Sequence, residues 1–240
     1  MHERYKKLAQ LHPRHFWTHE RGMTGLLISV LTYLLVTCAS GDFYYGEIVA
    51  HVFFSLVIIT GVLATFRQRW VFFLAVFLAV ASLVIDLVDH IPPLGSLTTM
   101  NAVLSLIFAG VLLAVLTSQV FQAGPVTAHR IRGAIVVYLL LGGIWGLLYL
   151  IVALNIPGAF RFSEALNPAN IDALQRQLTY FSFITLTTPG YGDITPVHPL
   201  ARTLAIFEAL AGQLYLVITL ARLVSLALME KKADTQQVSD

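Results

Sequence analysis

The stretch LTYFSFITLTTPGYGD, residues 178–193, decides the expected fold. Its first part, 178–186, is apolar, and its second part is a short polar loop that contains two glycines. A helix needs roughly 20 apolar residues to cross a bilayer, so this run is too short to span. Irregular backbone at membrane depth must be buried in protein or line a water-filled cavity. We therefore expect 178–193 to enter the membrane as a helix and to return as a loop.

The rest of the chain has the composition of a membrane protein. Of its 240 residues, 57% are hydrophobic and 12% charged, whereas soluble domains are about 45–50% apolar. The formal net charge is only +2, and the basic residues lie beside apolar segments rather than in one stripe, which excludes a nucleic-acid partner. The single cysteine, Cys38, supports no disulfide framework.

Six longer apolar runs surround this stretch, which lies between the fifth and the sixth. Each is long enough for a membrane-spanning helix. They cover 23–40, 47–66, 70–88, 101–121, 132–154 and 200–229. The predicted fold class is an all-α membrane protein with six transmembrane helices and a re-entrant helix between helices five and six.

The positions of Lys and Arg predict the orientation. Of the fifteen basic residues, three lie on the side of the re-entrant segment, namely Arg161, Arg176 and Arg202. The other twelve lie on the opposite side, beside the first helix, between helices two and three, between four and five, and after six. Because cytoplasmic loops carry the excess of Lys and Arg, both termini are predicted to be cytoplasmic.

Four parts of the chain follow from this topology. Residues 1–22 form a cytoplasmic amphipathic segment, in which His12, His15 and His19 recur at helical spacing and fit an interfacial helix better than a metal site. Residues 23–122 form a peripheral domain of four helices, 123–229 form the domain that contains the re-entrant segment, and 230–240 form a short cytoplasmic tail.

The string TTPGYGD at the end of the stretch differs at one position from the TTVGYGD pattern of potassium channels. The likeness continues into Ile194, Thr195 and Pro196 and through the last helix to Gly212, in the order helix, loop, helix. The chain thus resembles the prokaryotic potassium channel family with six transmembrane helices. The resemblance implies a homotetramer in the inner (plasma) membrane, with permeant K⁺ and lipid as its partners and with no cofactor.

The same resemblance implies which residues line the ion path. The backbone carbonyls of Thr188, Pro189, Gly190 and Tyr191 would replace the water shell of K⁺ when four loops meet on an axis, and the Thr188 hydroxyl would add a further ligand. Carbonyls that point at one axis require left-handed backbone at some positions. Glycines adopt this conformation without steric cost, as at Gly190 and Gly192.

Further residues are expected to support this selectivity filter. Thr187, Gly192 and Asp193 flank the ion-lining residues, and Tyr180 is the expected partner of Asp193. The pore helix is expected over 171–187, with Asp172 in its first turn beside the positive end of the helix dipole. Two residues of the last helix complete the set: Glu208 would support the filter from behind, and Gly212 would act as the gating hinge.

Pro189 departs from the family pattern. Proline keeps its carbonyl but loses its N–H and fixes φ near −65°, and it disfavours the α region for Thr188. In such a filter, the backbone of Thr188 is expected to have a compact rather than an extended conformation. Because of this substitution, a channel that passes both K⁺ and Na⁺ remains an alternative to a K⁺-selective one.

Gating and the other function classes depend on what the sequence lacks. Residues 101–122, the fourth helix, contain no Lys or Arg, so weak voltage dependence is expected, since gating charges supply the voltage response. The tail after Met229 is short for a ligand-binding domain.

No nucleophile with a base, metal cluster or phosphate loop points to an enzyme. A transporter or uptake subunit and a non-conducting scaffold or partner subunit remain as alternatives.

Overall fold

The computed structural model describes residues 13–39, 97–122, 127–163 and 170–239, with a few positions between 57 and 85. The predicted second and third crossings, 47–66 and 70–88, lie almost wholly outside the described residues, and so do residues 1–12.

Four long helices coincide with the other four predicted crossings. They are α2 (Pro13–Ala39), α5 (Thr98–Val120), α6 (Ala128–Asn155) and α8 (Pro199–Ser239). Among the described residues, Thr98–Val120, Ala128–Asn155 and Pro199–Leu226 are long and apolar enough to cross a membrane, and Met23–Thr37 in α2 is a shorter apolar run. The described chain is consistent with an all-α membrane protein.

Two helices are longer than their apolar runs. Helix α2 begins at Pro13, so residues 13–22 of the expected N-terminal segment are continuous with the first crossing. Helix α8 continues to Ser239, through most of the expected tail. A helix continues past its apolar core wherever no Pro or Gly ends it, because polar residues such as Glu, Lys and Gln are good helix formers.

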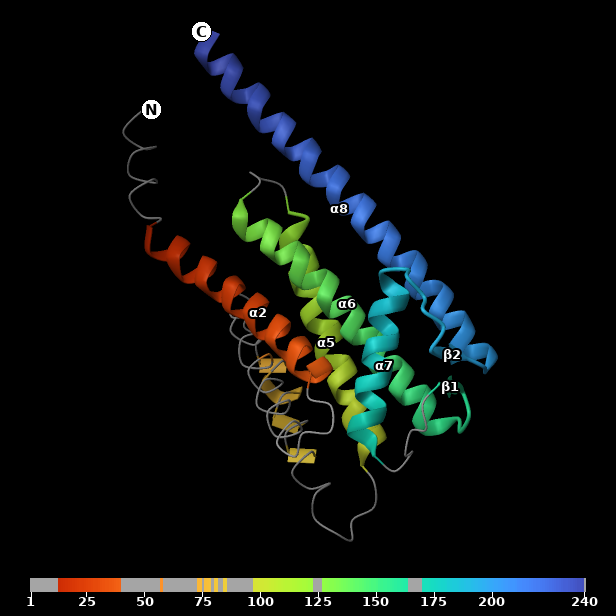
Figure 1. Ribbon diagram of the computed structural model, residues 1–240. Coiled ribbons are helices and arrows are strands. Elements are labelled where there is room, and N and C mark those ends of the chain that lie inside the picture. Colours follow the sequence, from red (N-terminus) through yellow and green to blue (C-terminus); the bar gives the residue numbers. More distant parts are fainter. Residues whose placement is uncertain are drawn as a thin grey trace.

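The segment between α6 and α8 folds back on itself and returns to its starting end (Figure 1). Helix α7 (Ile171–Leu186) begins at the end of the molecule where α6 ends and α8 starts. After α7 the chain turns back along α8 to strand β2 (Ile194–Pro196). This strand pairs antiparallel with β1 (Phe160–Phe162), with Arg161 opposite Thr195. The chain therefore leaves α6 and reaches α8 at the same end of the molecule, where the two strands pair before α7 and after the loop.

Local sequence explains where α7 begins. Asn170 is its N-cap, and its Oδ1 accepts a hydrogen bond of 2.9 Å from the Ala173 N–H. Asp172 lies in the first turn, where a negative charge stabilises the helix dipole. The helix matches the expected range 171–187 to within one residue.

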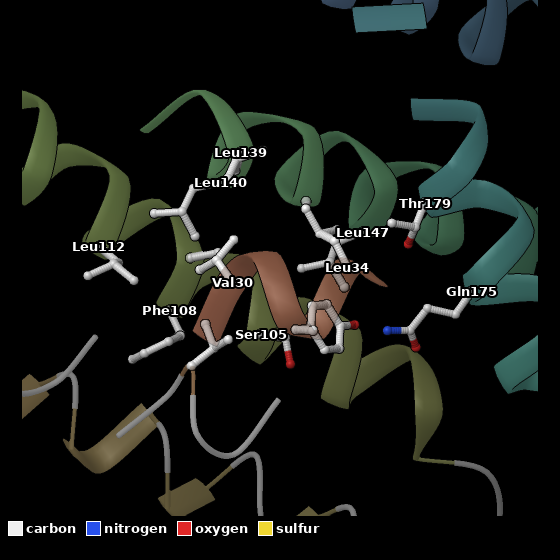
Figure 2. A pocket seen from close by; sticks show the side chains of 14 residues that line it. Val30, Leu34, Ser105, Phe108, Leu112, Leu139, Leu140, Leu147, Gln175 and Thr179 are labelled. Atoms are coloured by element: carbon white, nitrogen blue, oxygen red, sulfur yellow. The ribbon is translucent and has the colours of Figure 1, made fainter. Parts of the chain in front are cut away.

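Helix α6 lies at the centre and packs against α2, α5, α7 and α8. Leu26, Leu112, Leu116 and Val136 are buried at the junction of α2, α5 and α6. A cavity of about 80 Å³ remains between these three helices and α7, and apolar side chains such as Val30, Leu140 and Leu147 surround it (Figure 2). By contrast, α8 leaves many apolar side chains exposed, including Phe207, Leu214 and Val217.

Basic residues gather at one end of the described helices. The start of α2, the end of α5, the start of α6 and the end of α8 all lie at the end opposite the strands (Figure 1). Two side-chain contacts link these helices: Arg132 near the start of α6 donates to Thr24 of α2 at 2.9 Å, and Arg222 of α8 donates to the Phe121 carbonyl at the end of α5 at 3.4 Å.

Candidate functional site: the 187–193 loop

The loop between α7 and β2 is open to its surroundings in the single chain. Residues 187–192 are all exposed, and Tyr191 has 72% of its surface exposed. The residues on either side, Leu186 and Ile194, are buried at 1% and 4%. The loop is thus an exposed segment held between two buried anchors.

The backbone of this loop alternates in hand. Gly190 and Gly192 have φ of +54° and +81°, the left-handed conformation expected at these glycines, and Thr188 has φ of +71°. Pro189 and Tyr191 lie outside the positive-φ region. The positive φ places Thr188 outside the right-handed α region, which a following proline disfavours, but also outside the β and PPII regions that a following proline favours. A β-branched residue at positive φ is a rare conformation, typical of functional sites.

Backbone N–H groups fasten the loop to the end of α7. The Thr188 N–H donates to the Thr185 carbonyl at 3.1 Å, and the Gly190 N–H donates to the Ile184 carbonyl at 3.3 Å. Pro189 lies between these two residues and, because it has no N–H, donates no backbone hydrogen bond. Within the described part of the chain, the carbonyls of Thr188 to Tyr191 accept no backbone hydrogen bond, so they are available as ligands for a cation.

The far end of the loop is fixed through Asp193. The Tyr180 hydroxyl donates to Asp193 Oδ2 at 2.7 Å, which joins the two residues expected to be partners. The Ile194 N–H donates to Oδ1 at 3.0 Å, and the Ser163 N–H donates to the Asp193 carbonyl at 2.9 Å. The hydrogen bond to Asp193, assisted by burial and by the charge of that carboxylate, raises the pKa of Tyr180 to about 12.

The near end of the loop lies against α6 and α8 at the Leu186 carbonyl. Tyr138 donates its hydroxyl hydrogen to this oxygen at 3.4 Å. Gly212 of α8 faces the same oxygen so closely that an added Cβ would clash with it, and the Cβ would lie 2.9 Å from Leu186 Cδ1. Helix α8 continues without a break through Gly212, so the visible role of this glycine is to allow close approach to α7.

Behind α7, a buried carboxyl group joins three helices. Glu208 of α8 is 0% exposed. Its Oε2 lies 2.5 Å from the Tyr149 hydroxyl of α6, and its Oε1 lies 2.5 Å from the Ser182 hydroxyl of α7. The Ser182 hydroxyl is also 2.7 Å from the Gly142 carbonyl of α6. Glu208, the predicted support residue, therefore contacts α6 and α7 through its two carboxyl oxygens.

Aromatic rings fill the space beside this carboxyl group. Tyr149, Phe160 and Phe181 form three edge-to-face pairs with ring centroids 5.0–5.7 Å apart, a favourable geometry for aromatic pairs. The cluster ties α6, β1 and α7 together. The small residues of α6 allow the same approach, since a Cβ at Gly142 would lie 2.7 Å from the Phe183 ring, and one at Gly146 would lie 3.2 Å from Thr179 Cα.

The structure thus groups the predicted residues into one unit. Thr187 to Asp193 form the loop, Tyr180 holds its far end, Gly212 lies at its near end, and Glu208 lies behind the helix that carries it. Sequence reasoning missed Tyr149, Ser182 and the strands β1 and β2. A buried ionisable residue such as Glu208 signals that polar partners must exist, but no spacing along the chain identifies partners on other helices.

The described residues contain no group of three His, Cys, Asp or Glu side chains that could hold a metal ion. The side chains of His12, His15 and His19 lie outside the described part of the chain.

Comparison with known proteins gives one finding. Residues 137–228 match a family model described as "Ion channel". The match covers most of α6, the whole segment between α6 and α8, and most of α8. No curated protein and no solved structure matches the chain. The family match supports an ion channel with transmembrane helices, in a membrane, and favours a function other than catalysis.

Proposed function

We propose that this chain is one subunit of a homotetrameric, potassium-selective channel of the plasma membrane. K⁺ would pass through a filter formed by the carbonyls of Thr188, Pro189, Gly190 and Tyr191, with the Thr188 hydroxyl as a further ligand. Flow would be passive and would need no cofactor.

The alternating backbone of the exposed loop is the observation that carries the proposal. Positive φ at Thr188, Gly190 and Gly192, interrupted by Pro189 and Tyr191, lets successive carbonyls turn toward one side. Rings of carbonyl oxygens can replace the hydration shell of K⁺. The carbonyls have no backbone donor within the described chain, which fits groups whose partner is an ion.

The tetramer is supported by what one chain leaves uncovered. One subunit has a single loop of this kind, so a closed ring of carbonyls needs several copies. Helix α8 exposes a long apolar surface, which lipid and neighbouring subunits would cover.

The membrane orientation is supported by the basic residues. Arg132 near the start of α6 contacts Thr24 of α2, and Arg222 of α8 contacts the Phe121 carbonyl at the end of α5. By the positive-inside rule these ends would be cytoplasmic, and the loop would open toward the outer face. Both termini would then be cytoplasmic.

The decisive experiment is a reversal potential in planar bilayers. The purified protein would be reconstituted with K⁺ on one side and Na⁺ on the other, beside a Gly190→Ala control. We expect a reversal close to the K⁺ equilibrium potential and loss of current in Gly190→Ala, because alanine at φ of +54° costs roughly 1–2 kcal/mol in each subunit. No current from the wild type would favour a non-conducting scaffold.

A nonselective cation channel is the second candidate, and Pro189 is the observation that favours it. The proline removes an N–H from the filter backbone and follows a strained Thr188. Such a channel would reverse near zero in the same gradient. If Pro189→Val then moves the reversal toward the K⁺ potential, the proline is the cause of the poor selectivity.

Gating by voltage is expected to be weak. Helix α5, the fourth predicted crossing, contains no Lys or Arg, and each elementary charge that crosses 100 mV contributes about 2.3 kcal/mol. The open probability should therefore change little over the physiological voltage range. Gly212 is proposed as the hinge of any opening of α8.

A further inference from the structure

The hydrogen bonds around Glu208 can be counted. Glu208, Ser182 and Tyr149 are each 0% exposed, so water does not supply missing donors. The Ser182 Oγ lies within hydrogen-bond distance of two oxygens, at 2.5 Å from Glu208 Oε1 and 2.7 Å from the Gly142 carbonyl. A serine hydroxyl has a single hydrogen, and a backbone carbonyl has none, so one of these two contacts requires a hydrogen from elsewhere.

The missing hydrogen can come from one group alone. If Ser182 donates to Gly142, then Glu208 Oε1 must carry the hydrogen that lies between Oε1 and Oγ. If instead Glu208 is ionised, Ser182 must donate its hydrogen to Glu208. The Ser182 Oγ and the Gly142 carbonyl oxygen, 2.7 Å apart, would then face each other with no hydrogen between them. The second arrangement leaves a buried charge and an unfavourable contact.

We infer that Glu208 is protonated on Oε1 and that this proton makes it a positioning residue for the pore helix. The chain of donors then runs from the Tyr149 hydroxyl to Oε2, from Oε1 to Ser182, and from Ser182 to the Gly142 carbonyl. Every donor and acceptor in the chain is paired once. The single proton connects α8 through α7 to α6, three helices that lie together in Figure 1.

The surroundings fit a neutral carboxyl group. Among the described residues, the polar groups that contact Glu208 are the two hydroxyls, and Tyr138 of α6 is a further titratable group close enough to sense its charge. Tyr149, one of these two hydroxyl donors, is itself packed edge-to-face against the apolar rings of Phe160 and Phe181. A carboxylate here would lack a cationic partner in the described part of the chain, which is costly at membrane depth.

This proton has a consequence for the filter. Ser182 lies five residues before Thr187 on the same helix, whose end fastens the loop through the Ile184 and Thr185 carbonyls. Loss of the proton as the pH rises would place a charge behind α7 and leave the Gly142 carbonyl facing an oxygen without a hydrogen. We expect α7 to shift and the filter to lose its geometry at alkaline pH.

The proton itself is tested by infrared spectroscopy of the reconstituted full chain, wild type minus Glu208→Gln, at neutral pH. We expect the carbonyl stretch of a protonated carboxylic acid, with a shift to lower frequency in D₂O. Tyr149→Phe should move this band to higher frequency, because it removes the donor to the carbonyl oxygen. Carboxylate bands in place of the acid band would overturn the inference. As a control, Asp172→Asn, in the first turn of α7, should leave the acid band assigned to Glu208 unchanged.

The positioning role is tested by the pH profile of the current, and here the inference rests on the proposed function. Glutamine has the shape and the donor of the protonated acid, so Glu208→Gln should keep the wild-type current at neutral pH and remove its loss at alkaline pH. Glu208→Ala should lose the current at every pH. A wild-type current that is level to alkaline pH, or a Glu208→Gln current that still falls, would overturn the role. Since the infrared bands need no ion flow, failure of the channel proposal would leave the proton assignment testable.

Discussion

Among single residues, the contact between Tyr180 and Asp193 fixes the far end of the loop. Tyr180→Phe removes the hydroxyl that donates to Asp193 at 2.7 Å and keeps the ring. A hydrogen bond to a charged group contributes about 1.5 kcal/mol or more, so the variant should unfold at a lower temperature in detergent by a corresponding amount. Tyr191→Phe, whose ring is largely exposed in the single chain, is the comparison. Equal losses in the two variants would contradict a specific role for Tyr180.

The pH dependence of this contact follows from the raised pKa of Tyr180. Free tyrosine has a pKa near 10, and the folded value is about 12. The contribution to stability is therefore fully present below pH 10 and is lost as the pH rises through 12. Ultraviolet titration of tyrosinate, wild type minus Tyr180→Phe, should show this one group titrating about two units late. A normal titration would mean that the hydrogen bond is not formed in solution.

For the helices, the close approach of α8 to the end of α7 depends on a missing side chain. An added Cβ at Gly212 meets backbone and side-chain atoms of Leu186, and overpacking of this kind costs typically 1–3 kcal/mol. Gly212→Ala should therefore lower stability and impair conduction. Gly110→Ala in α5 is the matched control, because its Cβ would meet nothing within 4 Å and alanine is the better helix former. If Gly212→Ala is stable and conducts normally, both the packing and the hinge proposals fail.

The sequence predicted the helices but not the strands or the contacts between helices. Apolar length predicted α5, α6 and α8, and the short run before the glycines predicted α7, because both signals are local. The strands β1 and β2 were not predicted, since three-residue strands have no periodicity and β2 ends in Pro196. The Tyr149–Glu208–Ser182 contacts were not predicted either. They join residues 26 and 59 positions apart, which is a property of helix packing.

For the whole molecule, the proposal predicts an assembly of four chains that K⁺ stabilises. Native mass spectrometry should give about four times the 26.5 kDa of one chain. An ion that binds the tetramer and not the separated chains stabilises it by mass action, so the tetramer should dissociate at a higher temperature in K⁺ than in Na⁺. The same temperature in both salts would argue against a selective site, and dimers or monomers would argue against a ring of carbonyls.

The unbroken length of α8 has a mechanical consequence. Its 41 residues make a rod of about 60 Å, roughly twice the thickness of the hydrocarbon core of a membrane. From Gly212 to Ser239 the rod measures about 40 Å, so a tilt of about 10° around Gly212 would displace its far end by about 7 Å. The helix is thus a lever arm, and a small force applied at its far end acts with a large moment on the glycine that lies against Leu186 at the end of α7.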